Sequence, residues 1–339
     1  NSTGFTKYDK AEFTQRDKAA LWFDGSITKN LTLAAQGSYT FTIEEPVFFD
    51  LELLRLGGNF AQTGEKPFSF SFKAGRFKLS DFSNKVLSHT VDGGYIELAS
   101  PKLAFSLSTG FTGLVQKPAS SILISQSDLE DRTRDNYYFG SHRMVQGMNI
   151  KFPEIFLNQT MNIAVLYQRD FRTEERLHSG GGLVHTFYHG VGFSGPILSP
   201  LYYSAFVYLN SGTMDEDSLL AEMAGVTLNL YLQEFLGSKV SLDFLYASGD
   251  ADYETFYEGN TEGGATAFVP ISVSSPALVF APQLSNILYG TVSYAIKPLY
   301  NLDSEAAKQF SIQLNVSPFL RPTTGPLSVS GVDEDSDEL

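Results

Sequence analysis

Histidine side chains bind metals and transfer protons near neutral pH, and this sequence contains five of them. His185 and His189 are four residues apart within a segment of strand-like alternation. At that spacing two strand residues lie on one face but about 13 Å apart, too far to share one metal ion. His89, His142 and His178 are scattered along the chain. The histidines therefore predict no metal site.

Other motifs also fail to support cofactor binding or catalysis. The segment 190–195 reads Gly-Val-Gly-Phe-Ser-Gly, the string of a dinucleotide-binding loop. That loop requires a following helix, whereas Pro196 continues a strand-like run. Asp250, Asp252 and Glu254 lack the glycine and the spacing of a calcium loop. The chain has no Gly-x-Ser-x-Gly elbow of a hydrolase. We expect no enzyme, no cofactor and no catalytic residue.

The remaining ionisable residues belong to long segments in which apolar and polar residues alternate. In 31–42, Leu31, Leu33 and Tyr39 alternate with Thr32, Ser38 and similar polar residues, which is the two-residue period of a strand. These runs reach about 9–12 residues, matching the roughly 9–11 that a tilted strand needs to cross a bilayer. Strands of soluble proteins average about 5–6 residues. The pattern therefore favours a transmembrane β-barrel over a soluble β-sandwich.

The composition agrees with this interpretation. The mean hydropathy is −0.09, and no run approaches the roughly 18 apolar residues of a membrane helix. A barrel hides its apolar face by alternation, so its average hydropathy stays low. Aromatic residues make up 14% of the chain, cysteine is absent, and the net charge is −14. Because nucleic-acid binding needs a clustered basic surface, we expect no nucleic-acid partner.

Fourteen strands can be marked, and their connections alternate in length. The predicted strands are 19–27, 31–42, 46–58, 67–78, 92–100, 102–114, 143–153, 159–170, 184–198, 201–211, 221–233, 238–248, 285–297 and 308–318. Barrels have short periplasmic turns and long outer loops, so 115–142 and 249–284 are predicted outer loops. Residues 1–339 are expected to form a single outer-membrane barrel. The alternation leaves both ends outside, which predicts one further strand at each end and about sixteen in the complete protein.

Charges within the strands identify the predicted lumen. Facing a Lys or Arg to lipid at mid-bilayer costs about 2–4 kcal/mol, so strand charges should point inward. The resulting pore-lining candidates are Asp24, Asp50, Glu52, Arg55, Lys73, Arg76, Lys78, Glu97, Lys151 and Asp243. Arg76 and Lys78 reach the face of Lys73 only after a bulge at Gly75, and Arg55 needs a similar slip. The same charges could instead pair and stabilise the wall.

Loop 115–142 also carries charge, with Asp128, Glu130, Asp131, Arg132, Arg134 and Asp135. Folded into the barrel, this loop would constrict the pore. Standing outside, which is the commoner arrangement, it would be a solvated cap.

Two segments resemble known porins. Gly75-Arg76-Phe77 with Asp81, followed by Asp92-Gly93-Gly94-Tyr95, resembles a pattern of bacterial porins. The segment 245–250, Leu-Tyr-Ala-Ser-Gly-Asp, together with Thr255-Phe256 and Phe268-Val269-Pro270, is similar to the alginate-export-type porins. The resemblance covers about a quarter of the chain and implies passage of polar, saccharide-like solutes. Those exporters have a strongly basic lumen, whereas the lumen predicted here carries charges of both signs. This difference argues against the passage of polyanions.

The leading hypothesis is a porin of the bacterial outer membrane that passes small hydrophilic solutes through a polar, mixed-charge lumen. Its partners would be outer-membrane lipid and small polar solutes or ions. The alternatives are a plugged structural barrel that anchors envelope protein partners, and a surface adhesin that uses loops 115–142 and 249–284.

Overall fold

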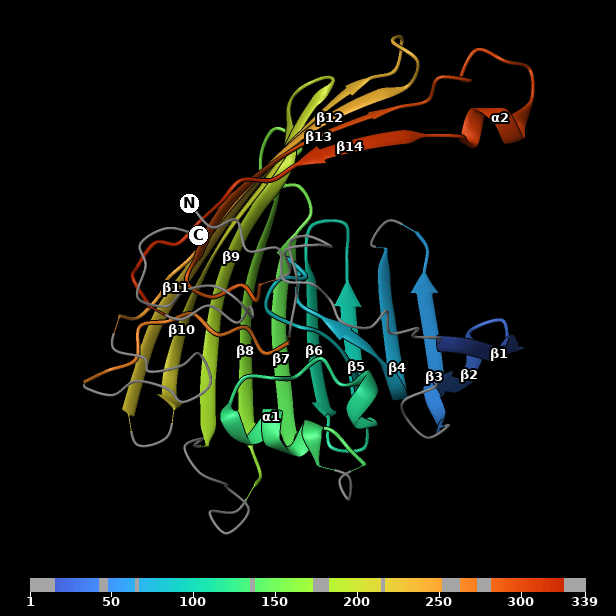
Figure 1. The fold of residues 1–339 in the computed structure, drawn as a ribbon. Coiled ribbons are helices and arrows are strands. Elements are labelled where there is room, and N and C mark those ends of the chain that lie inside the picture. The colour runs from blue at the N-terminus through green and yellow to red at the C-terminus, as the bar shows by residue number, and fades with distance from the viewer. Residues whose placement is uncertain are drawn as a thin grey trace.

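The structure is a computed structural model that describes residues 16–42, 48–64, 67–134, 138–172, 183–214, 217–251, 263–272 and 282–325. Nearly all of its regular secondary structure is β-strand (Figure 1). They are β1 (Arg16–Thr28), β2 (Leu31–Thr42), β3 (Phe48–Gln62), β4 (Phe68–Ser80), β5 (Ser88–Ala99), β6 (Ala104–Phe111), β7 (Arg143–Phe152), β8 (Thr160–Asp170), β9 (Val184–Leu198), β10 (Leu201–Met214), β11 (Asp217–Leu232), β12 (Ser238–Ala247), β13 (Ile287–Ile296), β14 (Ile312–Val316) and β15 (Phe319–Leu320). The helical segments are η1 (Lys117–Ala119), α1 (Gln126–Thr133) and α2 (Glu305–Gln309).

The strands form one antiparallel sheet in which each strand pairs with its neighbours in sequence, from β1 to β14, and β15 also pairs with β13. This up-and-down order confirms the predicted fold class, and each of the fourteen predicted strands is present. One clear difference is at β14, which is much shorter than the predicted 308–318. There Ser304 accepts a hydrogen bond from the Ala307 amide and caps α2, so the chain is helical up to Gln309.

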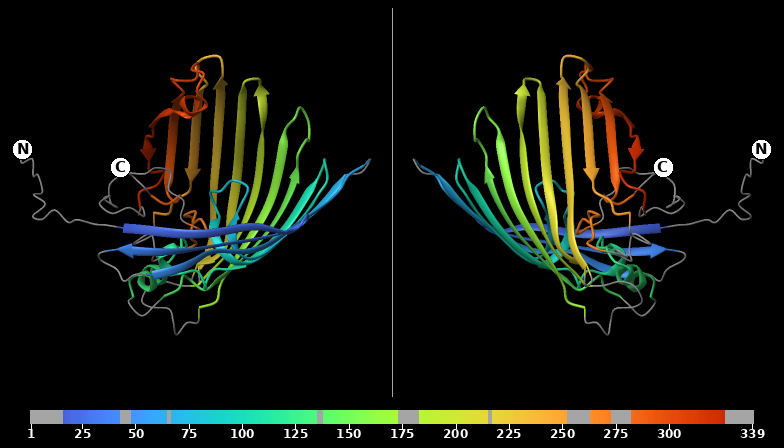
Figure 2. Two further views of the ribbon diagram at one scale, coloured as in Figure 1. Left: turned by 90° about the vertical axis from the view of Figure 1, so that its right-hand side faces the viewer. Right: turned by 90° about the vertical axis from the view of Figure 1, so that its left-hand side faces the viewer.

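The sheet is strongly curved but not closed, since no ladder joins β1 to β14 in the described part of the chain. Figure 2 shows β1–β3 crossing the long strands β9–β13 at a steep angle. Glycine permits the change of direction between β3 and β4. Gly75 has φ +111°, and a Cβ there would lie 2.2 Å from the Leu54 carbonyl oxygen. The two additional strands expected for the complete protein stay a prediction.

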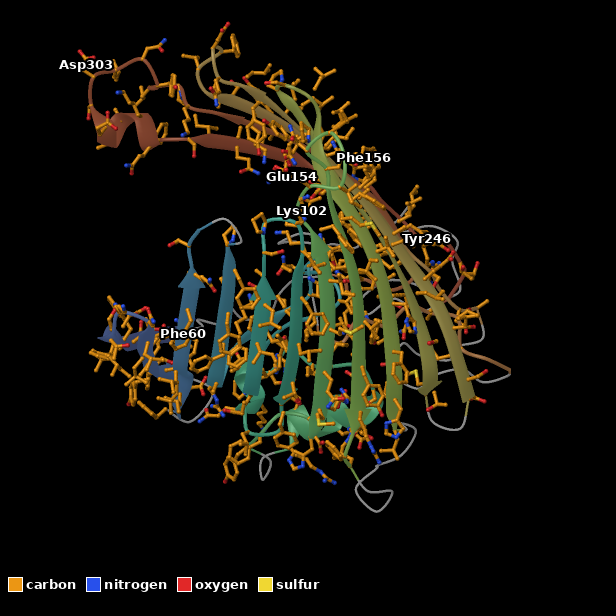
Figure 3. All side chains as sticks on the ribbon, turned by 180° about the vertical axis from the view of Figure 1, so that it is seen from behind. Phe60, Lys102, Glu154, Phe156, Tyr246 and Asp303 are labelled. Carbon is orange, nitrogen blue, oxygen red and sulfur yellow. The ribbon has the colours of Figure 1, made fainter. Side chains whose placement is uncertain are left out.

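Connections of two kinds lie at opposite ends of the sheet. Lys102, Glu154 and Phe156 belong to short turns that lie at one end, with Asp303 of the β13–β14 connection (Figure 3). The ends of β4, β6, β8 and β12, after which the longer connections begin, lie at the other end. These are called the turn end and the loop end below. No helix in the described ranges has the length and hydropathy needed to cross a membrane.

The two faces of the sheet differ as the alternation predicts. One face exposes large apolar side chains and is called the outer face; examples are Phe60, Leu107, Phe187, Val207, Phe244 and Val292. The opposite, inner face is polar near the turn end. Near the loop end it is covered by described parts of the loops, which contribute Val86, Ile122, Ile124, Phe268 and Leu284 to the main buried cluster. The core of the protein therefore lies between the inner face and its own loops.

Candidate functional site

The inner face of β10–β13 carries a wall of hydrogen-bonded polar side chains. Thr227 donates to Asp243 at 2.5 Å, and Ser241 donates to Asn229 at 2.8 Å on the neighbouring positions of the same two strands. Because alternate strand residues share a face, these pairs form a continuous polar strip that extends toward the turn end. The strip leaves polar atoms available to solutes while it holds the wall together.

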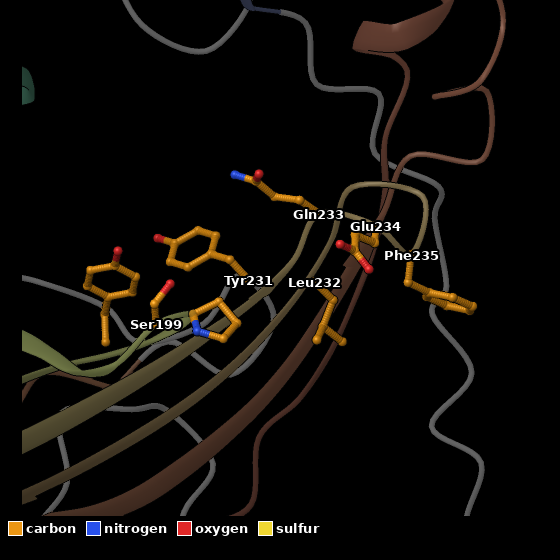
Figure 4. A pocket seen from close by; sticks show the side chains of 8 residues that line it. Ser199, Tyr231, Leu232, Gln233, Glu234 and Phe235 are labelled. Carbon is orange, nitrogen blue, oxygen red and sulfur yellow. The ribbon is translucent and has the colours of Figure 1, made fainter.

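At the turn end this strip opens into a cavity of about 890 Å³ (Figure 4). Its lining residues are Ser199, Pro200, Tyr202, Tyr231, Leu232, Gln233, Glu234 and Phe235. The rings of Tyr202 and Tyr231 meet edge to face at 5.7 Å, and the Lys239 ammonium lies 5.4 Å from the centre of the Tyr231 ring. Aromatic, amide and charged groups in one concave surface are typical of sites for polar organic molecules.

A charged cluster occupies the inner face on β1–β3. Glu52 forms an ion pair with Lys18 and accepts hydrogen bonds from Gln36 at 2.5 Å and Ser38 at 2.6 Å. The pairing of β2 with β3 slips between Gln36 and Gly37, which leaves Glu52 as an extra residue in β3. Because of this slip, Arg55 and Asp50 lie on the same face of the sheet, as predicted from the sequence.

The predicted bulge at Gly75 is absent. The ladders of β4 with β3 and with β5 run through Gly75 without a shift of register. Phe77 and Leu79 therefore lie on the same face of the sheet as Lys73, and both are buried beneath the loops. Arg76 and Lys78 fall on the alternate positions, so the prediction that they share the face of Lys73 was wrong. Positive φ at Gly75 bends the strand without inserting a residue.

Arg76 lies in the wall where β3 separates from β4. Its guanidinium donates two hydrogen bonds to Asp92, at 2.9 and 2.7 Å, and one each to the carbonyl oxygens of Leu51 and Leu114, both at 2.9 Å. A cavity of about 190 Å³ lies beside it, lined by Asp50, Leu51, Glu52, Arg76, Thr90, Val115 and Ala119. Three predicted site residues thus meet at this cavity.

The remaining predicted residues are spread along the inner face rather than gathered. By register, Asp24 is opposite Ala34, Lys73 opposite Tyr95, and Lys151 opposite Ala104. The Lys73 ammonium lies 5.1 Å from the centre of the Tyr95 ring, and Tyr95 donates to Glu97 at 2.6 Å. Carboxylate and ammonium groups therefore both occur across the inner face, and only some of them are paired.

The loop that carries α1 is fixed to the wall by a buried ion network. Asp128 pairs with Arg143 at 2.9 Å and with Arg172 at 3.2 Å, and Asp170 pairs with both arginines at 3.2 and 2.5 Å. The contacts of Asp128 with the two arginines are ion pairs without hydrogen-bond geometry, while its carboxylate accepts hydrogen bonds from the Ile124 and Ser125 amides and the Ser141 hydroxyl. Burial opposes the charge of Arg172, but Asp128 and Asp170 raise its pKa above the ordinary value. The described part of loop 115–142 thus folds inward, the less common of the two expected arrangements.

A second loop reaches farther across the inner face. Phe82, between β4 and β5, stacks on Tyr208 of β10 with ring centres 5.3 Å apart. Lys85 of the same loop donates to the hydroxyl of Tyr289 on β13 at 3.5 Å. The inner face is therefore partly blocked near the loop end.

The histidines in the described part of the chain do not gather into one site, and His178 lies outside that part. His89 is buried and shares a 2.9 Å hydrogen bond with Ser121. The register places His185 and His189 on the same face of β9, along with Phe187. No group of three potential metal ligands occurs in the described ranges. Asp252 and Glu254 lie outside those ranges.

Sequence reasoning missed several inner-face residues. Lys18 is six residues before Asp24 in the same strand and therefore lies on the same face. Continuing the alternation back from Asp24 would have included it. Tyr202 and Tyr231 carry no sequence signal that separates them from the other strand tyrosines. No local sequence pattern predicts the pairing of Asp128 with Arg172, because these residues lie in separate loops.

Comparisons with known proteins identify the fold. No family model and no curated protein matches the chain. OccK11 (OpdR) of Pseudomonas aeruginosa is 12% identical over 91% of this chain and 77% of its own, with a TM-score of 0.50. The fold is that of the outer-membrane porins. OpdQ of Pseudomonas aeruginosa (11% identity, 84% and 70% coverage, TM-score 0.46) and OmpF of Salmonella typhi (10%, 93% of each chain, 0.41) also match. A porin fold agrees with the predicted location in the bacterial outer membrane.

Proposed function

We propose that this protein is an outer-membrane channel that passes small hydrophilic solutes along its polar inner face. The observation that carries the proposal is the contrast between the two faces of one sheet. The outer face exposes Val207, Phe244 and Val292, which suit lipid, while Thr227, Asn229 and Asp243 form the polar strip behind them. Water and polar solutes would follow the strip.

Charges of both signs along the wall would favour polar over apolar solutes. Asp24, Asp50, Glu52, Arg55, Lys73, Glu97, Lys151 and Asp243 are the proposed lining. Lys73 and Glu97 both contact Tyr95, which places opposite charges close together on the inner face. Such pairs exclude apolar molecules because these would have to displace well-hydrated ions.

The experiment is single-channel recording of the purified full-length protein in a planar bilayer, with reversal potentials in a salt gradient. Stable conductance steps from the folded protein would support the channel. A heat-modifiable, folded barrel that never conducts would exclude it.

A plugged structural barrel that anchors envelope partners is the second candidate. It is favoured by the loops that cover the inner face through Phe82, Ile122 and Phe268. Release of these loops by mutation should open a channel if they are a constriction, and should produce no conductance if the barrel has only a structural role. The adhesin hypothesis needs loops that project outward, whereas the described parts of 115–142 and 249–284 pack inward.

The narrower likeness to alginate-export-type porins rests on sequence segments alone. The turn-end cavity with Tyr202, Tyr231 and Gln233 is compatible with saccharide-like solutes, since rings and amides both contact sugars. The mixed charge of the inner face still disfavours a polyanion.

A further inference from the structure

The 190 Å³ cavity beside β3 is lined by a buried acidic side chain with an unpartnered oxygen atom. Asp50 is only 5% exposed, and its Oδ1 atom has no hydrogen-bond partner in the described part of the chain. A buried carboxylate oxygen that has no hydrogen-bond partner loses its hydration without compensation, which destabilises the folded protein. Such a group is retained at a cost, which points to a ligand.

The nearby cations are already used. Lys18 pairs with Glu52. Arg76 donates to Asp92 and to the Leu51 and Leu114 carbonyl oxygens, which together accept four hydrogen bonds. Of the five guanidinium donors of an arginine, four are therefore occupied. Three carboxylates, those of Asp50, Glu52 and Asp92, lie near two cations, Lys18 and Arg76. Since the two cations pair with Glu52 and Asp92, Asp50 is the carboxylate without an ion pair.

We propose that this cavity binds one small cation, either a hydrated alkali ion or the ammonium group of a small amine, with Asp50 as its anchor. The volume is several times the roughly 30 Å³ occupied by one water molecule. It therefore accepts a cation with part of its hydration shell, or a methylammonium-sized group. A quaternary ammonium ion has no N–H group and no tightly bound water to donate to Oδ1, so it gains little from Asp50. Thr90 and Glu52 line the same cavity and supply further oxygen atoms.

Binding is independent of conduction, because a cation can occupy this cavity whether or not the inner face forms a channel. The test therefore uses stability of the folded full-length protein in detergent. Thermal unfolding would be compared in rubidium chloride, methylammonium chloride and tetraethylammonium chloride at equal ionic strength. A ligand that binds only the folded state raises the melting temperature.

We expect rubidium or methylammonium to raise the melting temperature above that in tetraethylammonium. The salt with the larger increase shows whether the cavity prefers an alkali ion or the ammonium group of an amine. Asp50→Asn should remove the difference. Asp24→Asn is the matched control, being the same change at an exposed position of β1, and should keep it. Ala119→Leu, which fills the cavity but retains Asp50, should also abolish the effect.

Equal melting temperatures of the wild-type protein in all three salts would overturn the proposal, as would an undiminished difference in Asp50→Asn. Either result would mean that Asp50 is protonated or bonded to another group. Conductance of the same samples would be scored separately, so failure of the channel and failure of the cation site can be told apart.

Discussion

The hydroxyl of Tyr208 on β10 donates a 2.9 Å hydrogen bond to Asp81, 127 positions earlier in the chain. The same carboxylate accepts hydrogen bonds from the backbone amides of Ser83, Val86 and Leu87. Asp81 thus shapes the loop between β4 and β5 and fixes it to the opposite part of the sheet. The loop contacts of Asp81 are local in sequence, whereas its contact with Tyr208 depends on the tertiary structure.

Tyr208→Phe should destabilise the protein by about 1–3 kcal/mol, because Asp81 would lose one buried donor and keep its backbone contacts. Reversible urea unfolding in lipid vesicles would measure this. Tyr203→Phe is the control on the same strand and should change the unfolding free energy by far less. Equal losses in both variants would show that the bond to Asp81 contributes nothing.

Asp128→Ala should cost about 3–5 kcal/mol, since it removes a buried carboxylate that pairs with both Arg143 and Arg172. The freed α1 loop should also increase single-channel conductance. Glu305→Gln, which breaks the exposed pair with Lys308, should have almost no effect. Wild-type stability and conductance in Asp128→Ala would contradict the proposed role of this network.

Gly93→Ala should impair folding, because the added Cβ would lie 2.0 Å from the Thr109 carbonyl oxygen and the backbone would have to move. A loss of about 1–3 kcal/mol or more is expected. At the next residue, Gly94→Ala places its Cβ 3.9 Å from the nearest atom, the Lys73 carbonyl oxygen, and should be tolerated. The fraction of heat-modifiable folded protein would compare the two, and similar yields would refute the steric argument.

Val207→Lys should cost about 2–4 kcal/mol in a bilayer, because Val207 is on the outer face near the middle of β10. Ser204→Lys, which is on the inner face by register, should cost much less. Unfolding free energies in vesicles would decide. The reverse order would mean that the two faces of the sheet have been assigned wrongly.

Lys73→Gln and Glu97→Gln should shift the reversal potential of the channel in opposite directions, toward cation and anion selectivity respectively. Both residues contact Tyr95 on the inner face, and each change removes one charge from the proposed lining. Lys102→Gln at an exposed turn serves as the control. Shifts of the same sign, or none, would remove these residues from the conduction path.

Much of the architecture could be predicted from the sequence because the two-residue period is a local property. Alternation in segments such as 31–42 and 201–211 required strands with one apolar face, and the lengths of the connections separated the turn end from the loop end. The face of Asp243 and Lys151 followed from the same count. Alternation became unreliable where the chain departs from regular geometry. The slip at Glu52 was anticipated correctly for Arg55, whereas Gly75 bends β4 without a slip and left Arg76 and Lys78 out of phase.

The sequence by itself determined that this chain is an antiparallel strand protein with a lipid-compatible face, since side-chain alternation depends only on neighbouring residues. Only the tertiary structure decided what covers the polar face and which charges are neutralised. Asp128 meets Arg172 and Tyr208 meets Asp81 because the sheet curves and its loops fold back. The same arrangement leaves Asp50 Oδ1 without a hydrogen-bond partner among the residues that the structure describes. Contacts between residues so far apart depend on curvature and loop path, which no local period encodes.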